Sequence, residues 1–271
     1  MSAVLRPIAF VLAASNHGTM IVNRNDYHMT GPNDGFGVGH QILSTSSCEQ
    51  GEVDLAVLLL KMKRRFKGDG VFGLDCGANI GTHTVEWARS MHGWGNVLSF
   101  EAQERVFYAL AGNVALNNCL NASVRNVAVG ASCGTLDIPE PNYLVPSSFG
   151  SLELKQRNDH EFIGQKINYS ELKPVNMVSI DSLDLKRVDL IKIDVEGMEM
   201  EVIQGAAETI TRCKPVLLIE TIKTDLTELQ NYLVSNGYMH MFGIGINVLA
   251  IHDEDPLANS IKIENGMISF V

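Results

Sequence analysis

The chain has 271 residues, of which 45% are hydrophobic and 19% are charged, a composition typical of a globular protein rather than a disordered one. Its formal net charge of −10 argues against unaided binding to nucleic acid and against binding to an anionic membrane surface. The five cysteines are scattered without C-x-x-C spacing, so they predict neither a disulfide framework nor a zinc site and favour a cytoplasmic protein.

The first fifty residues predict a β-rich extension. Apolar residues 8–14 are followed by a turn signal, Ser15-Asn16-His17-Gly18, and then by β-type residues 19–22, which favours a β-hairpin over a leader peptide. Four glycines between residues 31 and 39 argue against much regular structure there. We therefore expect an extension over residues 1–50 and a main domain over residues 51–271.

From residue 52 onward, helical and strand patterns alternate, which is typical of a doubly wound parallel sheet. The expected helices are 52–66, 82–91, 105–116, 199–212 and 226–235, and the expected strands are 71–75, 96–100, 123–129, 188–193 and 215–219. A hairpin over 238–242 and 246–251 would make the sheet mixed. The cations of 61–67 are typical of the solvated C-terminal end of a helix. The irregular residues 136–175 predict either a lid or substrate-binding loop or a surface excursion without a role.

The most informative segment is the turn after the first strand, Asp75-Cys76-Gly77-Ala78-Asn79-Ile80-Gly81. Gly77 and Gly81 let the backbone turn sharply and approach a ligand closely. A strand, a glycine turn and a helix together are typical of a nucleotide-type cofactor site. We therefore expect cofactor contacts from Asp75, Gly77, Ala78, Asn79 and Gly81.

The acid in front of the glycines restricts the choice of cofactor. A dinucleotide motif has three glycines, so that a pyrophosphate can lie on the turn. Here Asp75 would repel a diphosphate, so a ligand with an amine and no phosphate, such as S-adenosylmethionine, fits better. The alternative is a tight turn with a solvated Asp75.

Two further positions fit a nucleoside. Glu101 ends the second strand twenty positions after Gly81, where an acid hydrogen-bonds to both ribose hydroxyls of a cofactor. Nicotinamide cofactors use the same acid, so Glu101 predicts a ribose rather than one particular cofactor. Ala128, at the end of the third strand, either flanks an adenine ring or belongs to the sheet core.

Acidic residues also follow the fourth and fifth strands. Asp194 and Glu196 follow the fourth strand, and Glu220 ends the fifth, so all three should converge at the switch point of the sheet. A sulfonium ligand or a divalent metal would relieve their repulsion. Lys192, inside the fourth strand, needs a partner. The alternative is that Lys192 neutralises Asp194 while Glu196 and Glu199 are merely solvated.

Four segments together resemble the FkbM family of S-adenosylmethionine-dependent methyltransferases over about residues 70–220. The segments are 71–81, Phe100-Glu101, 180–183 and 189–199. Family members often have proline where this chain has Ala102. The resemblance implies a class I methyltransferase (Rossmann-like) α/β fold and O-methylation of a small-molecule or glycan hydroxyl, on a sugar, polyketide or other natural product.

The candidate catalytic residues are Asp194, Glu196 and Glu220. We expect Asp194 or Glu196 to act as general base or to anchor the acceptor hydroxyl, and Asp194 also to contact the cofactor. Related sugar and catechol O-methyltransferases hold a metal at positions comparable to Asp194 and Glu220, which leaves a divalent metal open here. An NAD-dependent oxidoreductase, which would need a glycine where Thr84 stands, and a non-catalytic cofactor-binding module remain alternatives.

Overall fold

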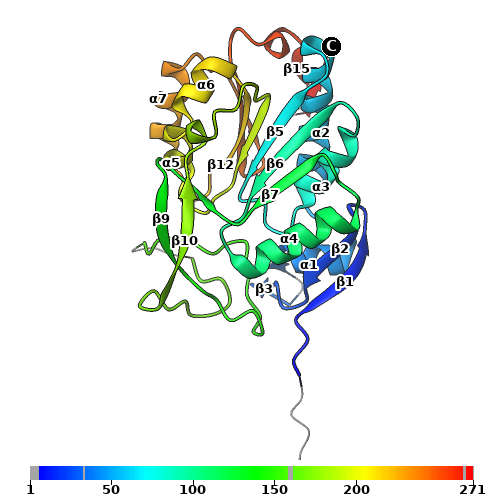
Figure 1. Cartoon of the computed structure of the whole chain (residues 1–271), viewed down its shortest axis with the longest axis vertical. Coiled ribbons are helices and arrows are strands. Elements are labelled where there is room, and N and C mark those ends of the chain that lie inside the picture. The colour runs from blue at the N-terminus through cyan, green and yellow to red at the C-terminus, as the bar shows by residue number, and fades with distance from the viewer. Residues whose placement is uncertain (1–5, 33, 158–160, 265–266, 271) are drawn as a thin grey trace, which may run out of the picture.

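The computed structural model describes residues 6–32, 34–157, 161–264 and 267–270. Its centre is a seven-stranded sheet with the order β13-β14-β12-β11-β5-β6-β7 (Figure 1). These strands are β5 (Val71–Cys76), β6 (Gly95–Phe100), β7 (Ala122–Arg125), β11 (Leu190–Ile193), β12 (Val216–Glu220), β13 (His240–Ile244) and β14 (Asn247–Ile251). β14 runs antiparallel to both of its neighbours, β12 and β13, and all other neighbouring strands in this sheet are parallel. The predicted mixed sheet with a C-terminal hairpin is confirmed.

Helices cover both faces of the sheet, as a doubly wound fold requires (Figure 1). One face carries α2 (Gln50–Lys67), α3 (Thr82–Ser90) and α4 (Glu104–Leu116), and the other carries α5 (Glu199–Gln204), α6 (Ala207–Cys213) and α7 (Leu226–Ser235). Successive side chains of β12 alternate between the two cores: Leu218 packs with α2 and α3, whereas Ile219 packs with α5 and α7. No helix in the described part of the chain is long and apolar enough to cross a membrane.

The N-terminal segment contains the predicted hairpin, β1 (Phe10–Ser15) paired with β2 (Gly18–Asn23). It also contains β3 (His28–Met29), β4 (Gly35–Phe36) and a helix that the glycine pattern did not predict, α1 (Val38–Thr45). A Cβ at Gly39 would lie 2.3 Å from the Asn23 carbonyl oxygen, so this glycine serves close packing rather than irregular backbone. The division into residues 1–50 and 51–271 stays a prediction.

The predicted third strand, 123–129, is in fact two strands. β7 ends at Arg125, and β8 (Ala128–Val129) joins a separate sheet with β9 (Gly134–Pro139) and β10 (Leu172–Val178). The Asn126 side-chain amide donates to the carbonyl oxygens of Glu101 and Ala102, which bends the chain between β7 and β8. The stretch 136–175 therefore has strands at both ends, and its described residues between them, 140–157 and 161–171, contain neither helix nor strand.

Two helix predictions also change in detail. The helix expected over 199–212 is divided into α5 and α6. Gly205, between them, packs closely on another segment, since a Cβ there would lie 2.1 Å from the Gly130 carbonyl oxygen. The basic end of α2 is not fully solvated, since Lys63 is buried in an ion pair with Asp255.

The remaining elements are the 3-10 helices η1 (Asp181–Leu183) and η2 (Pro256–Asn259) and the hairpin β15 (Ile261–Glu264) with β16 (Met267–Phe270).

The N-terminal hairpin is attached to the main sheet through one fully buried side chain of α4, Asn113. Its Oδ1 accepts from the Ile21 amide at 2.5 Å, and its Nδ2 donates to the carbonyl oxygens of Ile21, at 3.2 Å, and Ile80, at 2.8 Å. The same side chain thus links the hairpin to the glycine turn after β5.

We expect Asn113→Ala to lower the free energy of unfolding by at least ~2 kcal/mol, because each buried polar group left without a partner costs about 1–3 kcal/mol. Chemical denaturation followed by circular dichroism measures this. Asn231→Ala, an exposed position within α7, is the matched control and should be neutral or slightly stabilising. Equal stability of the two variants would contradict the anchoring role of Asn113.

Candidate active site

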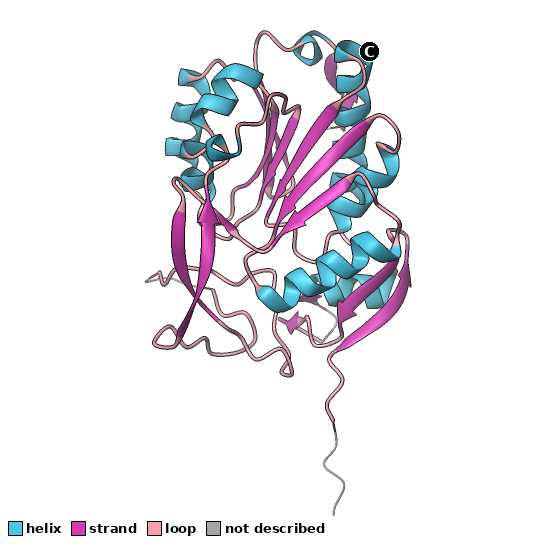
Figure 2. Ribbon diagram, viewed as in Figure 1, coloured by secondary structure: helices cyan, strands magenta, loops and turns pink. Residues whose placement is uncertain are grey.

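A cavity of about 430 Å³, hereafter the main cavity, lies at the carboxyl ends of β5, β6, β11 and β12. Figure 2 shows that the long loop after β9 and the N-terminal segment gather at this end of the sheet. The lining residues come from four parts of the chain: 36–49, 77–103, 127–161 and 194–246. The sheet therefore supplies one wall, and segments distant in sequence supply the others.

The glycine turn after β5 lies against the end of β11. Gly77 has a φ of 81°, and a Cβ there would lie 1.7 Å from the Asp194 carbonyl oxygen, so only glycine fits. Asn79 is also left-handed, with a φ of 50°, and its Oδ1 accepts from the Ile80 amide at 2.7 Å. Gly77, Asn79 and Asp194 all line the main cavity.

Glu101 is held rigidly at the floor of the main cavity. Its Oε2 accepts from the Asn79 amide at 3.0 Å and its Oε1 from the Gln103 amide at 2.8 Å. Burial raises the pKa of Glu101 to about 7, although the two amides act in the opposite direction. Each oxygen keeps a lone pair for a further donor, so this carboxylate can accept hydrogen bonds from a vicinal diol.

Asp75 lies beneath the turn rather than in the cavity wall. It is fully buried, and its Oδ2 accepts from the Thr84 hydroxyl at 2.6 Å, which also bonds to the Ser99 hydroxyl at 2.7 Å. The alternative of a solvated Asp75 is therefore wrong. Asp75, Ala78 and Gly81 are not among the lining residues, so their predicted contact with a cofactor stays a prediction, whereas Ala128 does line the cavity.

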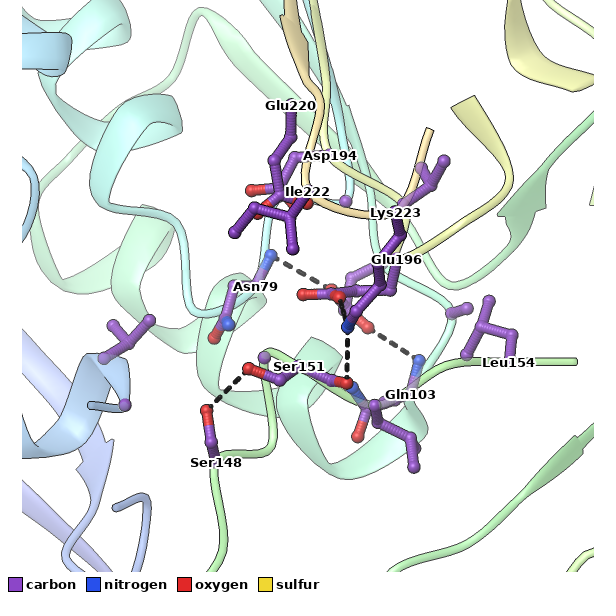
Figure 3. A pocket seen from close by; sticks show the side chains of 18 of the residues that line it. Asn79, Gln103, Ser148, Ser151, Leu154, Asp194, Glu196, Glu220, Ile222 and Lys223 are labelled. Carbon is purple, nitrogen blue, oxygen red and sulfur yellow. Dashed lines mark hydrogen bonds and ion pairs between the residues drawn. The ribbon is translucent and has the colours of Figure 1, made fainter. Parts of the chain in front are cut away.

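Three acids meet opposite the turn (Figure 3). Oxygens of Asp194, Glu196 and Glu220 all lie within 4.8 Å of one another. Asp194 accepts from Lys192 at 2.7 Å, and Glu196 pairs with Lys223. Glu220 is only 8% exposed, and its Oε2 has no hydrogen-bond partner in the described part of the protein.

Burial and the neighbouring negative charges favour the protonated forms of Glu196 and Glu220. Burial, followed by the charge of Asp194, raises the pKa of Glu220 to about 8 and that of Glu196 well above its usual range. The neutralisation of Asp194 by Lys192 is confirmed, but Glu196 and Glu199 are not merely solvated. Glu199 is buried and accepts from the amides of Val195 and Gly197. A positive ligand in the main cavity would stabilise the ionised acids.

The long loop is fixed against the glycine turn. The Gln103 side chain donates to the Phe149 carbonyl oxygen at 2.8 Å, and a Cβ at Gly150 would lie 2.7 Å from the Asn79 Nδ2. Lys223 also donates to the Ser151 carbonyl oxygen at 3.0 Å. The loop thus forms a wall of the main cavity, which favours the substrate-loop interpretation of this stretch over a surface excursion.

Sequence reasoning missed several lining residues. Lys223 stands three positions after Glu220 and is the second cation of the acid group, a spacing that could have identified it. Gln103 follows Glu101 by two positions but has no motif of its own. The residues from the N-terminal segment, among them Phe36, Gln41 and Glu49, had no signal in the chain that placed them here.

Comparison with known proteins gives the family. Residues 75–239, more than half of the chain, match the Methyltransferase FkbM domain. Methyltransferase sdnD of Sordaria araneosa is 30% identical over 158 residues, which are 51% of this chain and 61% of that protein. Methyltransferase 1 of Beauveria bassiana is 25% identical over 147 residues, which are 51% of this chain and 59% of that protein. The chain thus matches about three fifths of the length of these curated relatives.

Among solved structures, methyltransferase FkbM from Methylobacillus flagellatus aligns with a TM-score of 0.46 at 19% identity, covering 68% of this chain and 43% of that one. The sheet order described above is that of a class I methyltransferase, as expected. The chain belongs to the FkbM family of S-adenosylmethionine-dependent methyltransferases.

Proposed function

We propose that the protein transfers the methyl group of S-adenosylmethionine to a hydroxyl of a small molecule or glycan, such as a sugar, a polyketide or another natural product. The observation that carries this proposal is that the main cavity is lined both by Glu101, which two backbone amides fix, and by Glu220, a buried carboxylate whose Oε2 has no hydrogen-bond partner among the described residues. The cytoplasmic location expected from the cysteine pattern stays part of the proposal.

The floor of the main cavity fits the cofactor. Glu101, fixed by two backbone amides, would accept from the ribose hydroxyls, and Ala128 would lie beside the adenine. Gly77 leaves open the space that a Cβ would fill. Asp194 would face the positive end of the ligand, with Asp75 supporting the turn from below. The bound cofactor supplies an activated methyl group on a sulfonium.

The acids opposite the floor fit deprotonation of an acceptor hydroxyl. Lys192 holds Asp194 and Lys223 holds Glu196, whereas the Glu220 Oε2 has no hydrogen-bond partner among the described residues. Glu220 is therefore the carboxylate best placed to take a proton. A raised pKa near 8 suits a general base working near neutral pH. In this proposal the cofactor would supply the methyl group to the acceptor oxygen and be released as S-adenosylhomocysteine, while the hydroxyl proton would pass to Glu220.

Asp194 and Glu196 then serve as positioning groups in this proposal. Their lysine partners fix both carboxylates at the edge of the main cavity, where each can still accept from an acceptor hydroxyl. A divalent metal held by Asp194, Glu196 and Glu220 would have to compete with both lysines, which favours the proton-transfer role of this group.

The proposed activity is tested directly by incubating the protein with S-adenosylmethionine labelled with tritium in its methyl group and separate small-molecule, glycan, lipid and nucleic-acid fractions. We expect label in a small-molecule or glycan fraction, in a base-stable ether, together with S-adenosylhomocysteine. Cofactor binding without turnover in every fraction would support a non-catalytic module instead.

Removing the ribose acceptor should weaken cofactor binding. We expect Glu101→Ala to raise the Kd for S-adenosylmethionine about 10- to 100-fold, because hydrogen bonds to a charged group contribute about 1.5–3 kcal/mol. Asp75→Asn should raise it less, since Asp75 acts through the turn. Calorimetry measures both, circular dichroism checks the fold, and Glu104→Ala, an exposed neighbour, is the control. Unchanged affinity in both variants, or tight binding of NADH, would contradict the cofactor assignment.

The base role predicts the form of the pH dependence. Since the carboxylate must be ionised to accept a proton, the single-turnover rate should rise with pH and level off above a midpoint at or below about 8, because a bound sulfonium lowers the pKa. Glu220→Gln should reduce the rate about 10²- to 10⁴-fold and abolish this rise of the rate with pH. Asp194→Asn and Glu196→Gln should slow the reaction but keep the rise of the rate with pH.

Glu228→Gln, on the exposed surface of α7, is the matched control for these three variants. A Glu220→Gln enzyme that keeps the wild-type rate and its rise with pH would rule out Glu220 as the base. Loss of this pH dependence in Asp194→Asn or Glu196→Gln instead would identify that residue as the base.

A further inference from the structure

A second group of titratable side chains, distinct from the three acids described above, reaches the main cavity through one of its members, Glu49. Glu49, the residue before α2, and Glu52, in the first turn of α2, face His83 in the first turn of α3. Glu49 lines the main cavity, whereas His83 is only 3% exposed. We call Glu49, Glu52 and His83 the histidine cluster.

The imidazole of His83 is buried without a hydrogen-bond partner. Neither ring nitrogen makes a hydrogen bond within the described residues, and the same holds for the Oε1 of Glu52. Buried polar atoms are normally paired, and leaving them unpaired is costly. The His83 Nε2 is directed into the cluster, 3.4 Å from the Glu52 Oε1 and 3.6 Å from the Glu49 Oε2.

These separations are longer than a direct N–H···O hydrogen bond, which spans about 2.7–3.2 Å. They match the distance between two ligands on one ion instead. Ligands about 2.0–2.2 Å from a tetrahedral Zn²⁺ lie roughly 3.4 Å from each other. The three candidate ligand atoms all lie within 4.8 Å of one another, so a small movement of the Glu49 side chain would bring all three within bonding distance of one ion. Glu49 is the most exposed of the three and can make that adjustment.

We propose that Glu49, Glu52 and His83 form a binding site for a divalent transition-metal ion, with Zn²⁺ as the best-fitting ion. One imidazole and two carboxylates are ligands that suit Zn²⁺ and its neighbours, whereas Mg²⁺ and Ca²⁺ prefer oxygen alone. An ion held here would lie in the wall of the main cavity, because Glu49 lines it.

The surroundings of the cluster support a site for a cation. The Asn247 side chain donates to the Glu52 Oε2 at 2.6 Å, which orients this carboxylate and leaves Oε1 directed at His83. The Trp87 ring lies edge-to-face with His83, with 5.6 Å between the ring centroids, and restricts the imidazole. Lys192, the nearby cation, donates to Asp194 at 2.7 Å rather than to the cluster.

The histidine cluster differs from the three acids of the main cavity in its ion-pair partners. Asp194 and Glu196 already have lysine partners, whereas no lysine or arginine of the described residues lies within ion-pair distance of Glu49 or Glu52. The charge of Lys192 acts on Glu49 and Glu52 from a distance, but Lys192 itself pairs with Asp194. A divalent ion would therefore give these two carboxylates a cation in direct contact.

The test is a calorimetric titration of the chelator-treated full chain with ZnCl₂, and separately with MgCl₂, in the absence of cofactor and acceptor. We expect one Zn²⁺ per chain with a micromolar or lower Kd and much weaker binding of Mg²⁺. Glu49→Gln and His83→Gln should each raise the Zn²⁺ Kd tenfold or more. Glu86→Gln, on α3 but paired with His17, is the matched control and should bind as the wild type does.

Because Glu49 is partly exposed, Glu49→Gln tests the site even where His83→Gln fails to fold. Co²⁺ in place of Zn²⁺ should give visible absorption that both variants lose. No binding by the wild type, or equal affinity in the wild type and both variants, would overturn the proposal and leave an ion pair with a protonated His83. Loss of binding in Glu220→Gln alone would also overturn it. None of these readouts requires methyl transfer, so they are independent of the proposed function.

Discussion

The close approach of Gly77 to the carbonyl oxygen of Asp194 is the contact on which the rest of the site depends. It joins the ends of β5 and β11, the two strands between which the direction of chain winding reverses. Ligands of open α/β sheets bind at such a switch point. Because no side chain fits between the two backbones, the glycine turn and the acids after β11 are held at one fixed separation. The glycine turn after β5 and the acids after β11 are therefore parts of one structure.

Burying several acids at that point creates the second constraint. Lys192 and Lys223 each neutralise one carboxylate, but Glu101 and Glu220 keep pKa values raised by burial to about 7 and about 8. Burial therefore opposes the ionisation of Glu101 and Glu220, and a cationic cofactor would favour it. The sheet edge is thus matched to a positive ligand by charge as well as by shape, which is consistent with a sulfonium and not with a diphosphate.

Local sequence pattern was sufficient to predict the sheet and the meeting of Gly77, Glu101 and Asp194 at one cavity. The run from Val71 to Gly81, the acid at Glu101 and the segment around Asp194 each consist of contiguous residues whose types follow from the turn or strand they occupy. The errors occurred where one distant contact decides the local structure. Asn126, directly after β7, bonds to the carbonyl oxygens after β6, and Gly205, between α5 and α6, lies against the Gly130 backbone.

The other half of the main cavity could not be predicted for the same physical reason. Its walls come from the N-terminal segment around Phe36, from the loop around Ser151 and from Lys223 after β12, and no local period relates these three segments. They meet because tertiary hydrogen bonds hold them: Gln103 binds the loop, and Asn113 anchors the hairpin to the turn. The shape of the main cavity therefore depends on long-range packing around a locally encoded glycine turn and sheet edge. In the proposed function, a change of acceptor would require changes in these segments and would leave the contact between Gly77 and Asp194 intact.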